Sequence, residues 1–436
     1  NGNIITQWEK NTIEDLGLLK MDFLGLRNLD IISDTLQRLG FDFSFLERLD
    51  MHDPATFQLL QDGSGIAVFQ VESPQMRELL KRLVPTSIDD IAAVLALYRP
   101  GPMAMNMHYD YADRKNKRQL IKYFHEDAKP ILGNTYGLSV YQEQVMEISR
   151  VFAGYSMAEA DNLRKIMGKK LPEVMAREKA KFVSGCIGQG YEADFSSELF
   201  HMIEGFAAYG FNASHAYSYA YISYWTAYLK AHYPREYFAS ICTSVMDDID
   251  RSAVYLNEAK RIGLKVYPPD LNLSEMGYTV EDDGIRIGLS AMKNFGESQA
   301  TKLMEERSHG RFTSLYDFTK RYNPNINALK SLAYSGALDS FGTRQGIDAI
   351  AEDVLKATRK ESKKNIDGQG SMFDSDTIID FEIPTTEFQE ADILRHEKET
   401  LGIYVSGHPL DELVDRMTKY TIDDIKSLDD QKELVK

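Results

Sequence analysis

The amino-acid sequence predicts a mostly α-helical protein with a small β contribution, an α+β fold, built from several domains. Its 436 residues suffice for two to four domains at roughly 100–200 residues each. Apolar residues recur at helical spacing between glycine and proline breakers along most of the chain. Hydrophobic residues make up 43% and charged residues 27% of the chain, which is the composition of a soluble globular protein.

The composition also excludes several classes of protein. The longest apolar run, residues 91–98, is far shorter than the roughly 20 residues that span a bilayer, so no membrane partner is expected. The two cysteines, Cys186 and Cys242, are too few for a disulfide framework and are not spaced as metal ligands, which indicates a reducing compartment. The chain starts at Asn1 without a basic and apolar leader, and we expect it to be a piece of a longer protein.

The first elements are predicted from their breakers. Residues 16–26 form a short apolar segment that would be a strand, and a helical pattern over 29–39 stops at Gly40. Residues 87–90 have the pattern of a capping box before the apolar run, and Pro100 to Pro102 end that helix.

Later elements are predicted in the same way. Ser156 to Glu159 form a second capping box, which predicts a helix over 157–167 with Gly168 just beyond its end. Residues 284–341 contain two short helical patterns around glycine turns. Residues 342–390 turn polar and are expected to be an exposed linker.

Charge is unevenly distributed along the chain. The formal net charge is -16, yet basic residues gather in the middle of the sequence. They occur as adjacent pairs: Arg114-Lys115, Lys117-Arg118, Arg164-Lys165 and Lys169-Lys170. A basic island in an acidic chain is either a set of solvated helix faces or a site for anions.

Lys20 and Asp22 lie two residues apart in the first apolar segment. If this segment is a strand, its period of two places both side chains on one face. Asp22 would then suit a hard cation and Lys20 an anion, whereas a salt bridge at a strand edge is the simpler alternative.

Two further groups of residues suggest contacts with a nucleotide. Arg164, Lys165, Lys169 and Lys170 gather near the end of one predicted helix, where they suit phosphates or simply favour the helix dipole. Residues 206–233 are rich in aromatic residues at helical spacing, a pattern of either a helix core or a stacking surface. Within that segment Asn212, Ser214 and His215 are placed to cap a helix and to project donors into a cleft, although a histidine of this kind is often structural.

Taken together, seven motifs resemble the alpha subunit of bacterial DNA polymerase III, the replicative C-family polymerase, over about residues 1–415. In sequence order they are Lys20 to Leu26, Val68 to Ser73, Leu97 to Pro102, Gly137 to Val145, Met167 to Lys170, Tyr209 to His215 and Leu401 to Leu410. Each is weak alone, and their common order and spacing carry the resemblance.

The resemblance implies a catalytic role for the N-terminal part of the chain. Residues 1–62 would be the C-terminal part of the palm, with Asp22 as the third catalytic aspartate and Lys20 beside the phosphates. Two-metal catalysis with Mg²⁺ would need two further aspartates that are not upstream of Asp22 in this chain. We therefore expect the chain alone to bind primer-template weakly and to incorporate little or no nucleotide.

The resemblance assigns residues 63–272 to the fingers. Triphosphate contacts would come from four cations: Arg99, Arg164, Lys165 and Lys169. Ser214 and His215 would lie near the incoming sugar, and Lys170 would contact DNA.

The remaining residues resemble DNA-binding and partner-binding elements of the family. Residues 273–345 would be a tandem helix-hairpin-helix element, with Lys293 and Gly296 at a turn that offers N–H groups to DNA phosphates. The sequence departs from the family at Asn294-Phe295-Gly296, where the family more often has a smaller aliphatic residue before the glycine. Residues 346–390 would be an exposed linker whose clamp-binding peptide uses three residues, Gln369, Met372 and Phe373. Residues 391–436 would lead into an OB-fold that the chain does not complete.

The function that this resemblance implies is template-directed DNA synthesis in the bacterial replicase, in the cytoplasm at the nucleoid. The implied partners are primer-template DNA, a dNTP, the sliding clamp, the clamp loader and a proofreading exonuclease. Two alternatives remain open at this point: a catalytically inactive module that binds DNA and the clamp, and an error-prone polymerase of the same family.

Overall fold

The structure is a computed structural model of the 436-residue chain. It describes residues 4–9, 12–13, 16–19, 21, 25–169, 172–207, 209–366 and 381–410. At positions 168–169, 172, 207 and 361–366 it describes the backbone alone.

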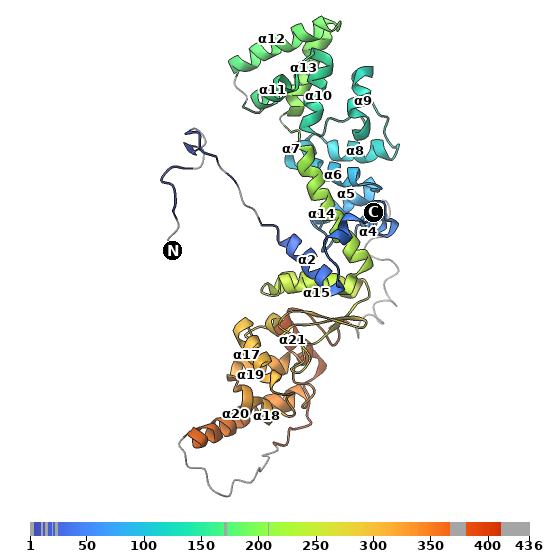
Figure 1. The fold of residues 1–436 in the computed structure, drawn as a ribbon. Helices are drawn as coiled ribbons and strands as arrows, with labels where there is room; N and C mark the ends of the chain where they lie inside the picture. Colours follow the sequence, from blue (N-terminus) through green and yellow to red (C-terminus); the bar gives the residue numbers. More distant parts are fainter. Residues whose placement is uncertain are drawn as a thin grey trace, which may run out of the picture.

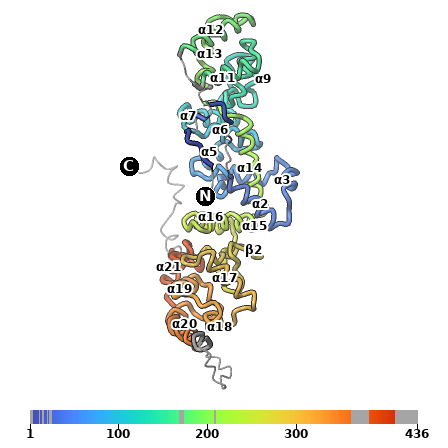
Figure 2. The backbone as a smooth tube through the Cα atoms, turned by 60° about the vertical axis from the view of Figure 1, so that its left-hand side comes forward, coloured from blue at the N-terminus to red at the C-terminus, as the bar shows by residue number. Residues whose placement is uncertain are grey.

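The described chain forms an elongated, helix-rich molecule with one small sheet, which confirms the predicted α+β class. Three groups of elements follow one another along its length, and the long helix α14 (Ala213–His232) runs through the middle group as a spine (Figure 1). A view from another side shows the same succession (Figure 2).

One end of the molecule is a helical group with its own apolar core. Phe152, Phe182 and Phe200 are fully buried at its centre. Its elements are η1 (Glu126–Ala128), α9 (Lys129–Leu132), η2 (Gly133–Thr135), α10 (Gln142–Ala153), α11 (Met157–Lys169), α12 (Pro172–Gly188) and α13 (Ala193–Ala207).

The middle group packs around α14. Ala216, Ala220 and Ala227 are fully buried on that helix, and their small side chains allow α6 to pack closely against it. Besides α14, the elements are α2 (Arg27–Leu39), α3 (Ser44–Glu47), α4 (Pro54–Gln61), α5 (Pro74–Leu83), α6 (Ile88–Leu97), α7 (Pro100–Ala104), α8 (Met107–Lys115), α15 (Pro234–Ser244) and α16 (Ile249–Arg261).

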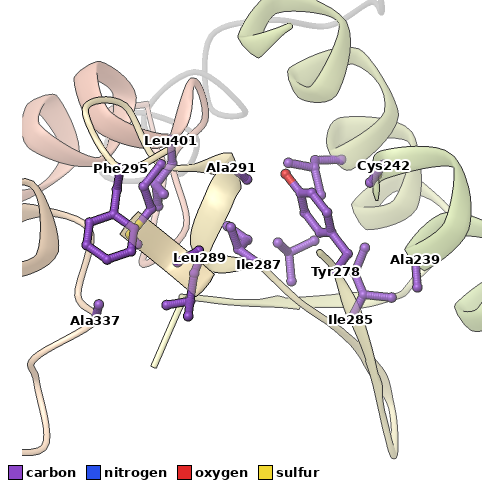
Figure 3. Packing of buried hydrophobic residues seen from close by; sticks show 14 of the residues in the cluster. Ala239, Cys242, Tyr278, Ile285, Ile287, Leu289, Ala291, Phe295, Ala337 and Leu401 are labelled. Carbon is purple, nitrogen blue, oxygen red and sulfur yellow. The ribbon is translucent and has the colours of Figure 1, made fainter. Parts of the chain in front are cut away.

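The other end combines the sheet with five helices. The sheet consists of β1 (Lys265–Tyr267), β2 (Thr279–Glu281) and β3 (Gly284–Arg286) in the order β1-β3-β2, with β1 parallel and β2 antiparallel to β3. Then follow η3 (Leu289–Ala291), α17 (Glu297–Ser308), α18 (Leu315–Tyr322), α19 (Ile326–Tyr334), α20 (Arg344–Ile366) and α21 (Glu390–Leu401). Its core is continuous with the middle group, since Ala239 and Cys242 of α15 face Tyr278 and Ile285 (Figure 3).

Several helix ends lie where the sequence predicts them. Gly40 ends α2 in the left-handed conformation, with φ of 72°. Ser87 and Asp90 form the expected capping box of α6, and Ser156 and Glu159 form that of α11. One expectation is wrong: α11 continues through Gly168 to Lys169 instead of ending before that glycine.

The expected linker over 346–390 is also wrong for its first part. Residues Arg344–Ile366 form α20, in which Ile347, Ala351, Val354 and Leu355 are buried against α18 and α19. The apolar residues recur at helical spacing, so a helix buries one apolar stripe while its polar residues remain in solvent. Residues 367–380 lie outside the described chain.

A loop over residues 63–72 is held by side chains from much later helices. Ala67 and Gln70 adopt left-handed conformations, with φ of 64° and 63°. Ser223 donates to the Phe69 carbonyl at 2.9 Å, and Thr226 accepts from the Phe69 N–H at 3.1 Å. These contacts compensate for the unusual backbone by satisfying its buried polar groups.

Some expected features cannot be placed. Residues 20 and 22–24 lie outside the described chain, and no strand occurs among the described residues of 16–26. The OB-fold expectation falls partly on residues 411–436, which are also outside, and the described residues 391–401 belong to helix α21. Among the described helices, none is both long and apolar enough to cross a bilayer.

Candidate functional site

Four segments that are far apart in the sequence meet beside the N-terminal end of α14. They are the entry to α7 at Arg99, the start of α10 at Gln142, helix α11 at Arg164, and residues 209–215. The meeting point lies where the helical group that contains α10 to α13 joins the middle group (Figure 1).

Arg99 lies between two of these segments. Its guanidinium carbon is 4.4 Å from the centre of the Phe211 ring, and Nη2 donates to the Tyr209 carbonyl at 2.7 Å. Nε donates to the Ala96 carbonyl at 2.9 Å, and burial lowers the pKa of the guanidinium. Gly101 makes this arrangement possible, because a Cβ at that position would lie 2.1 Å from the Tyr209 ring.

A short parallel bridge fixes residues 209–212 to the start of α10. The Phe211 N–H donates to the Val140 carbonyl at 3.0 Å, and the Gln142 N–H donates to the Phe211 carbonyl at 2.9 Å. The bridge therefore determines where the Phe211 ring lies relative to Arg99.

Glu143 holds the first turn of α14. Its carboxylate accepts from Asn212 Nδ2 at 2.9 Å and from the Ala213 N–H at 3.0 Å. Asn212 caps the helix as expected, because its side-chain oxygen accepts from the His215 N–H at 2.8 Å. The Glu143 carboxylate and the Asn212 carboxamide thus accept from N–H groups that have no partner within the first turn of the helix.

His215 and Ser214 are exposed in the first turn of α14. The His215 ring lies 5.3 Å from the Phe211 ring and 4.3 Å from the Tyr219 ring. Arg99 and His215 therefore contact the same aromatic ring, which places a cation and an imidazole on one continuous surface.

Arg164 and Lys165 share one counter-ion in α11. Arg164 donates to Asp161 at 2.8 and 3.0 Å, and it reaches Gln142 Oε1 at 3.4 Å. Lys165 Nζ lies 2.7 Å from Asp161. Hydrogen bonds from Lys165 and Arg164 lower the pKa of Asp161, so this carboxylate stays charged.

This arrangement is suited to a phosphorylated ligand with a planar ring. Arginine forks bind phosphate oxygens in pairs, and the row Phe211, His215 and Tyr219 offers ring faces for stacking. Phosphate would compete with Asp161 for both cations of α11. Lys169 belongs to the same helix, but only its backbone is described.

No metal centre can be built from the described residues. They contain no group of three or more histidine, cysteine, aspartate or glutamate side chains that could hold a metal ion. Asp22, the expected Mg²⁺ ligand, and Lys20 lie outside the described chain, as does Lys170.

The expected DNA-binding turn lies in the group that contains the sheet, directly before α17 (Figure 1). Lys293 is exposed there, but its N–H already donates to the Thr400 carbonyl of α21 at 2.9 Å. The Gly296 N–H donates to Gln299 Oε1 at 3.1 Å. These two N–H groups are occupied within the protein, whereas the Lys293 side chain is exposed at the turn. The clamp-binding residues Gln369, Met372 and Phe373 lie outside the described residues.

Sequence reasoning did not single out several residues of this arrangement. Gln142, Glu143, Tyr209 and Phe211 belong to the motifs quoted above, but their roles depend on contacts between distant segments. Asp161 had a local signal, because a carboxylate three and four residues before two cations on a helix is placed to pair with both.

The chain is similar to known proteins over most of its length. Residues 28–190 match the finger domain of the bacterial DNA polymerase III alpha subunit, and residues 263–347 match a helix-hairpin-helix motif. These ranges overlap the expected fingers and hairpin regions with different ends, so the domain limits stay a prediction.

Three curated relatives are named DNA polymerase III subunit alpha. That of Mycobacterium tuberculosis (strain CDC 1551 / Oshkosh) is 43% identical over 94% of this chain, that of Aquifex aeolicus 40% over 100%, and that of Vibrio cholerae 40% over 96%. The chain spans 36%, 37% and 38% of their respective lengths. The motifs, the finger-domain match and these identities together show that the chain belongs to the family of bacterial DNA polymerase III alpha subunits.

Proposed function

We propose that this chain is the part of a replicative, template-directed DNA polymerase that binds the incoming dNTP and holds DNA. The meeting of Arg99, Arg164 and His215 beside α14 is the observation that supports the proposal, because these residues come from three segments that are far apart in the sequence. The names of the relatives support a DNA polymerase role for the longer protein.

Each residue has a proposed role that its surroundings support. Arg164 and Lys165 bind the triphosphate after exchanging Asp161 for phosphate oxygens. Arg99 is held by two backbone carbonyls and one ring, so it adds positive charge at a fixed position. His215 and Ser214 face the sugar of the nucleotide from the exposed first turn of α14.

Catalysis itself is assigned to the palm. In this proposal Asp22 is one carboxylate ligand of a two-Mg²⁺ site, with Lys20 beside the phosphates. Magnesium ions in such sites stabilise the charge on the transferring phosphoryl group. Lys169 and Lys170 extend the positive surface toward phosphates of the nucleotide and DNA, and a peptide with Gln369, Met372 and Phe373 binds the sliding clamp.

The test is dNTP binding by the chain, measured by titration calorimetry with dATP. Replacing Arg164 by Gln should weaken binding by about tenfold or more, because a charge-assisted contact with phosphate is lost. Arg150→Gln is the matched control, since Arg150 is an arginine on α10 that pairs with Glu147 at the surface. Equal affinities for the chain and the Arg164→Gln variant would contradict the proposed site.

The sugar contact needs a separate measurement. We expect His215→Ala to change the ratio of dATP to ATP affinity, because the side chain would face the 2′ position of the sugar. An unchanged ratio and an unchanged dATP affinity would remove His215 from the site while leaving the phosphate contacts intact.

A further inference from the structure

The loop over residues 63–72 borders the row of rings at the proposed dNTP site. His215, Tyr219 and Ser223 follow one another at intervals of four residues, so they lie along one face of α14. The first two belong to that row, and Ser223 donates to the Phe69 carbonyl of the loop at 2.9 Å. The Phe69 ring is 8% exposed, and its centre lies 5.3 Å from that of the Tyr219 ring. The rings and the loop therefore form one continuous surface along α14.

The backbone of this loop is fixed from several sides. The Tyr237 hydroxyl of α15 donates to the Ala67 carbonyl, and Lys230 of α14 donates to two further carbonyls of the loop at 2.7 Å. The Glu72 carboxylate accepts from the Ala67 N–H at 2.9 Å. Left-handed conformations such as those of Ala67 and Gln70 persist where the surroundings over-determine them, and they cluster at ligand-binding and catalytic sites.

Gln70 is the residue that this fixed backbone presents to solvent. Its neighbours Phe69 and Val71 are buried, whereas Gln70 is exposed and its side chain forms no hydrogen bond with the described residues. Glycine or asparagine adopts the left-handed conformation at lower cost than glutamine. The contacts of the loop thus account for the conformation of its backbone, and they leave the glutamine side chain without a role in the fold.

The position of the loop along α14 relates it to the nucleotide. From His215 to Ser223 the helix rises by about 12 Å, at 1.5 Å per residue. This distance corresponds to roughly three or four base steps of about 3.4 Å each. The loop therefore lies within a few base pairs of a nucleotide whose sugar is at His215.

We infer that Gln70 contacts the minor-groove edge of a base pair of primer-template DNA beside the incoming nucleotide, an inference that rests on the proposed function. The carboxamide NH₂ group donates to a purine N3 or a pyrimidine O2, which every base pair presents in the minor groove. A donor to these acceptors binds DNA of any sequence, as template-directed synthesis requires. In the major groove the acceptors differ between base pairs, so a contact there would favour certain sequences.

The test is the affinity of the 436-residue chain for a primer-template duplex, measured by fluorescence anisotropy at low salt. Gln70→Met keeps the length of the side chain and removes its donor, so it should weaken binding by roughly three- to tenfold. Gln37→Met on α2 is the matched control, since the Gln37 side chain is also exposed and forms no hydrogen bond with the described residues. Equal affinities of the parent chain and Gln70→Met would overturn the inference.

Modified DNA shows whether the contact is made to a base edge. In 3-deazapurines a C–H group replaces N3, which removes the purine acceptor of the minor groove. One duplex carries these bases next to the primer end on the primer strand, and a second carries them on the template strand. The parent chain should bind one of the two by roughly three- to tenfold more weakly than the unmodified duplex, and there Gln70→Met should cause no further loss.

The remaining outcomes are distinct. Equal losses in Gln70→Met on all duplexes would place the contact on the DNA backbone and contradict the minor-groove assignment. Equal binding of modified and unmodified DNA by the parent chain would contradict it even if Gln70→Met fails to fold. Neither result affects the dATP titration of Arg164→Gln, whereas a parent chain that binds neither dATP nor primer-template would overturn the proposed function as well.

Discussion

A single carboxylate, Asp161, lies beside two of the cations proposed to bind phosphate. It pairs with Arg164 at 2.8 Å and with Lys165 at 2.7 Å. Any phosphate that reaches these cations must compete with Asp161. The affinity for nucleotide therefore reflects the difference between the contacts of the two cations with phosphate and their contacts with Asp161.

We predict that Asp161→Asn tightens dATP binding by roughly two- to fivefold, because an exposed ion pair of modest strength no longer competes. Titration calorimetry at low and moderate salt measures the effect, which should shrink as salt rises. Glu147→Gln, which removes the partner of Arg150 on α10, should leave the affinity unchanged. Weaker binding in Asp161→Asn would mean that the carboxylate positions the cations and does not compete for them.

A second carboxylate has a structural role. Glu258 and Lys230 form an ion pair at 2.5 Å with side chains that are each 1% exposed, and Lys230 also donates to the carbonyls of Ser64 and Ile66. Burial lowers the pKa of Lys230 to about 8, which shows how strongly its charge depends on these partners.

We expect Glu258→Gln to destabilise the protein by about 3 kcal/mol, because it leaves a buried ammonium without its counter-ion. Urea unfolding followed by circular dichroism measures the loss. Glu352→Gln removes the partner of Lys356 in a pair whose side chains are 69% and 72% exposed. That control should change stability by less than about 1 kcal/mol, and similar losses in the two variants would contradict this reasoning.

At the level of elements, the turn before α7 determines how closely residues 209–211 approach. Gly101→Ala places a methyl group where the Tyr209 ring lies, so the ring must move together with the carbonyl that accepts from Arg99. We predict that dATP affinity falls by about tenfold, because the guanidinium loses its position.

The control for this change is Gly133→Ala. A Cβ at Gly133 has open space around it, and that residue has a helical φ of -58°. Both variants should be compared by dATP titration and by thermal unfolding. If Gly133→Ala loses as much dATP affinity as Gly101→Ala, the loss does not depend on the position of Arg99, and the prediction is wrong.

The start of α11 carries a pH-dependent contribution to stability. Hydrogen bonds from the Ser156 N–H, from Lys181 and from the Ser156 hydroxyl lower the pKa of Glu159 to about 2. The folded-state pKa lies below the ordinary value of 4.5, so the stabilisation is present above pH 4.5 and is lost as pH falls toward 2.

We expect Glu159→Gln to be less stable than the parent chain at neutral pH and equally stable near pH 2. Urea unfolding of both proteins across this pH range measures the difference in free energy of unfolding. A difference that stays constant from pH 7 to pH 2 would show that the charge of Glu159 does not contribute.

Across the whole molecule, the proposed dNTP site and the hairpin turn lie far apart along the long axis, with the middle group between them (Figure 1). Lys293→Ala should therefore weaken binding of a DNA duplex and leave dATP affinity unchanged. Because one phosphate contact is lost, the salt dependence of DNA binding should fall by about one unit of slope. Fluorescence anisotropy with labelled duplex at several salt concentrations measures this slope, and an unchanged slope would exclude a phosphate contact at Lys293.

The sequence predicts features that depend on neighbouring residues better than those that depend on distant ones. The capping boxes at Ser87 and Ser156 and the end of α2 at Gly40 follow from local hydrogen bonding and backbone conformation. The polar composition of the α20 segment predicts a linker, because it hides an apolar stripe that matters only against α18 and α19.

The same distinction applies to the candidate site. The sequence indicates Arg99, Arg164 and His215 as separate candidates, from two motifs and one cluster of cations. The contact of Arg99 with the Phe211 ring depends on two segments more than 100 residues apart. Local spacing on one helix carried enough information to pair Asp161 with its two cations. Bringing α7, α10, α11 and α14 together required the tertiary structure.

The loop over residues 63–72 has a consequence for synthesis on the ribosome. Its stabilising partners Ser223, Thr226 and Tyr237 follow it by 154 to 170 residues. At roughly 5–20 residues per second, the nascent loop waits about 8–34 s for these partners to be translated. During that interval its apolar residues Val68 and Phe69 are available to chaperones and proteases, so the rate of translation downstream of the loop influences the yield of folded protein.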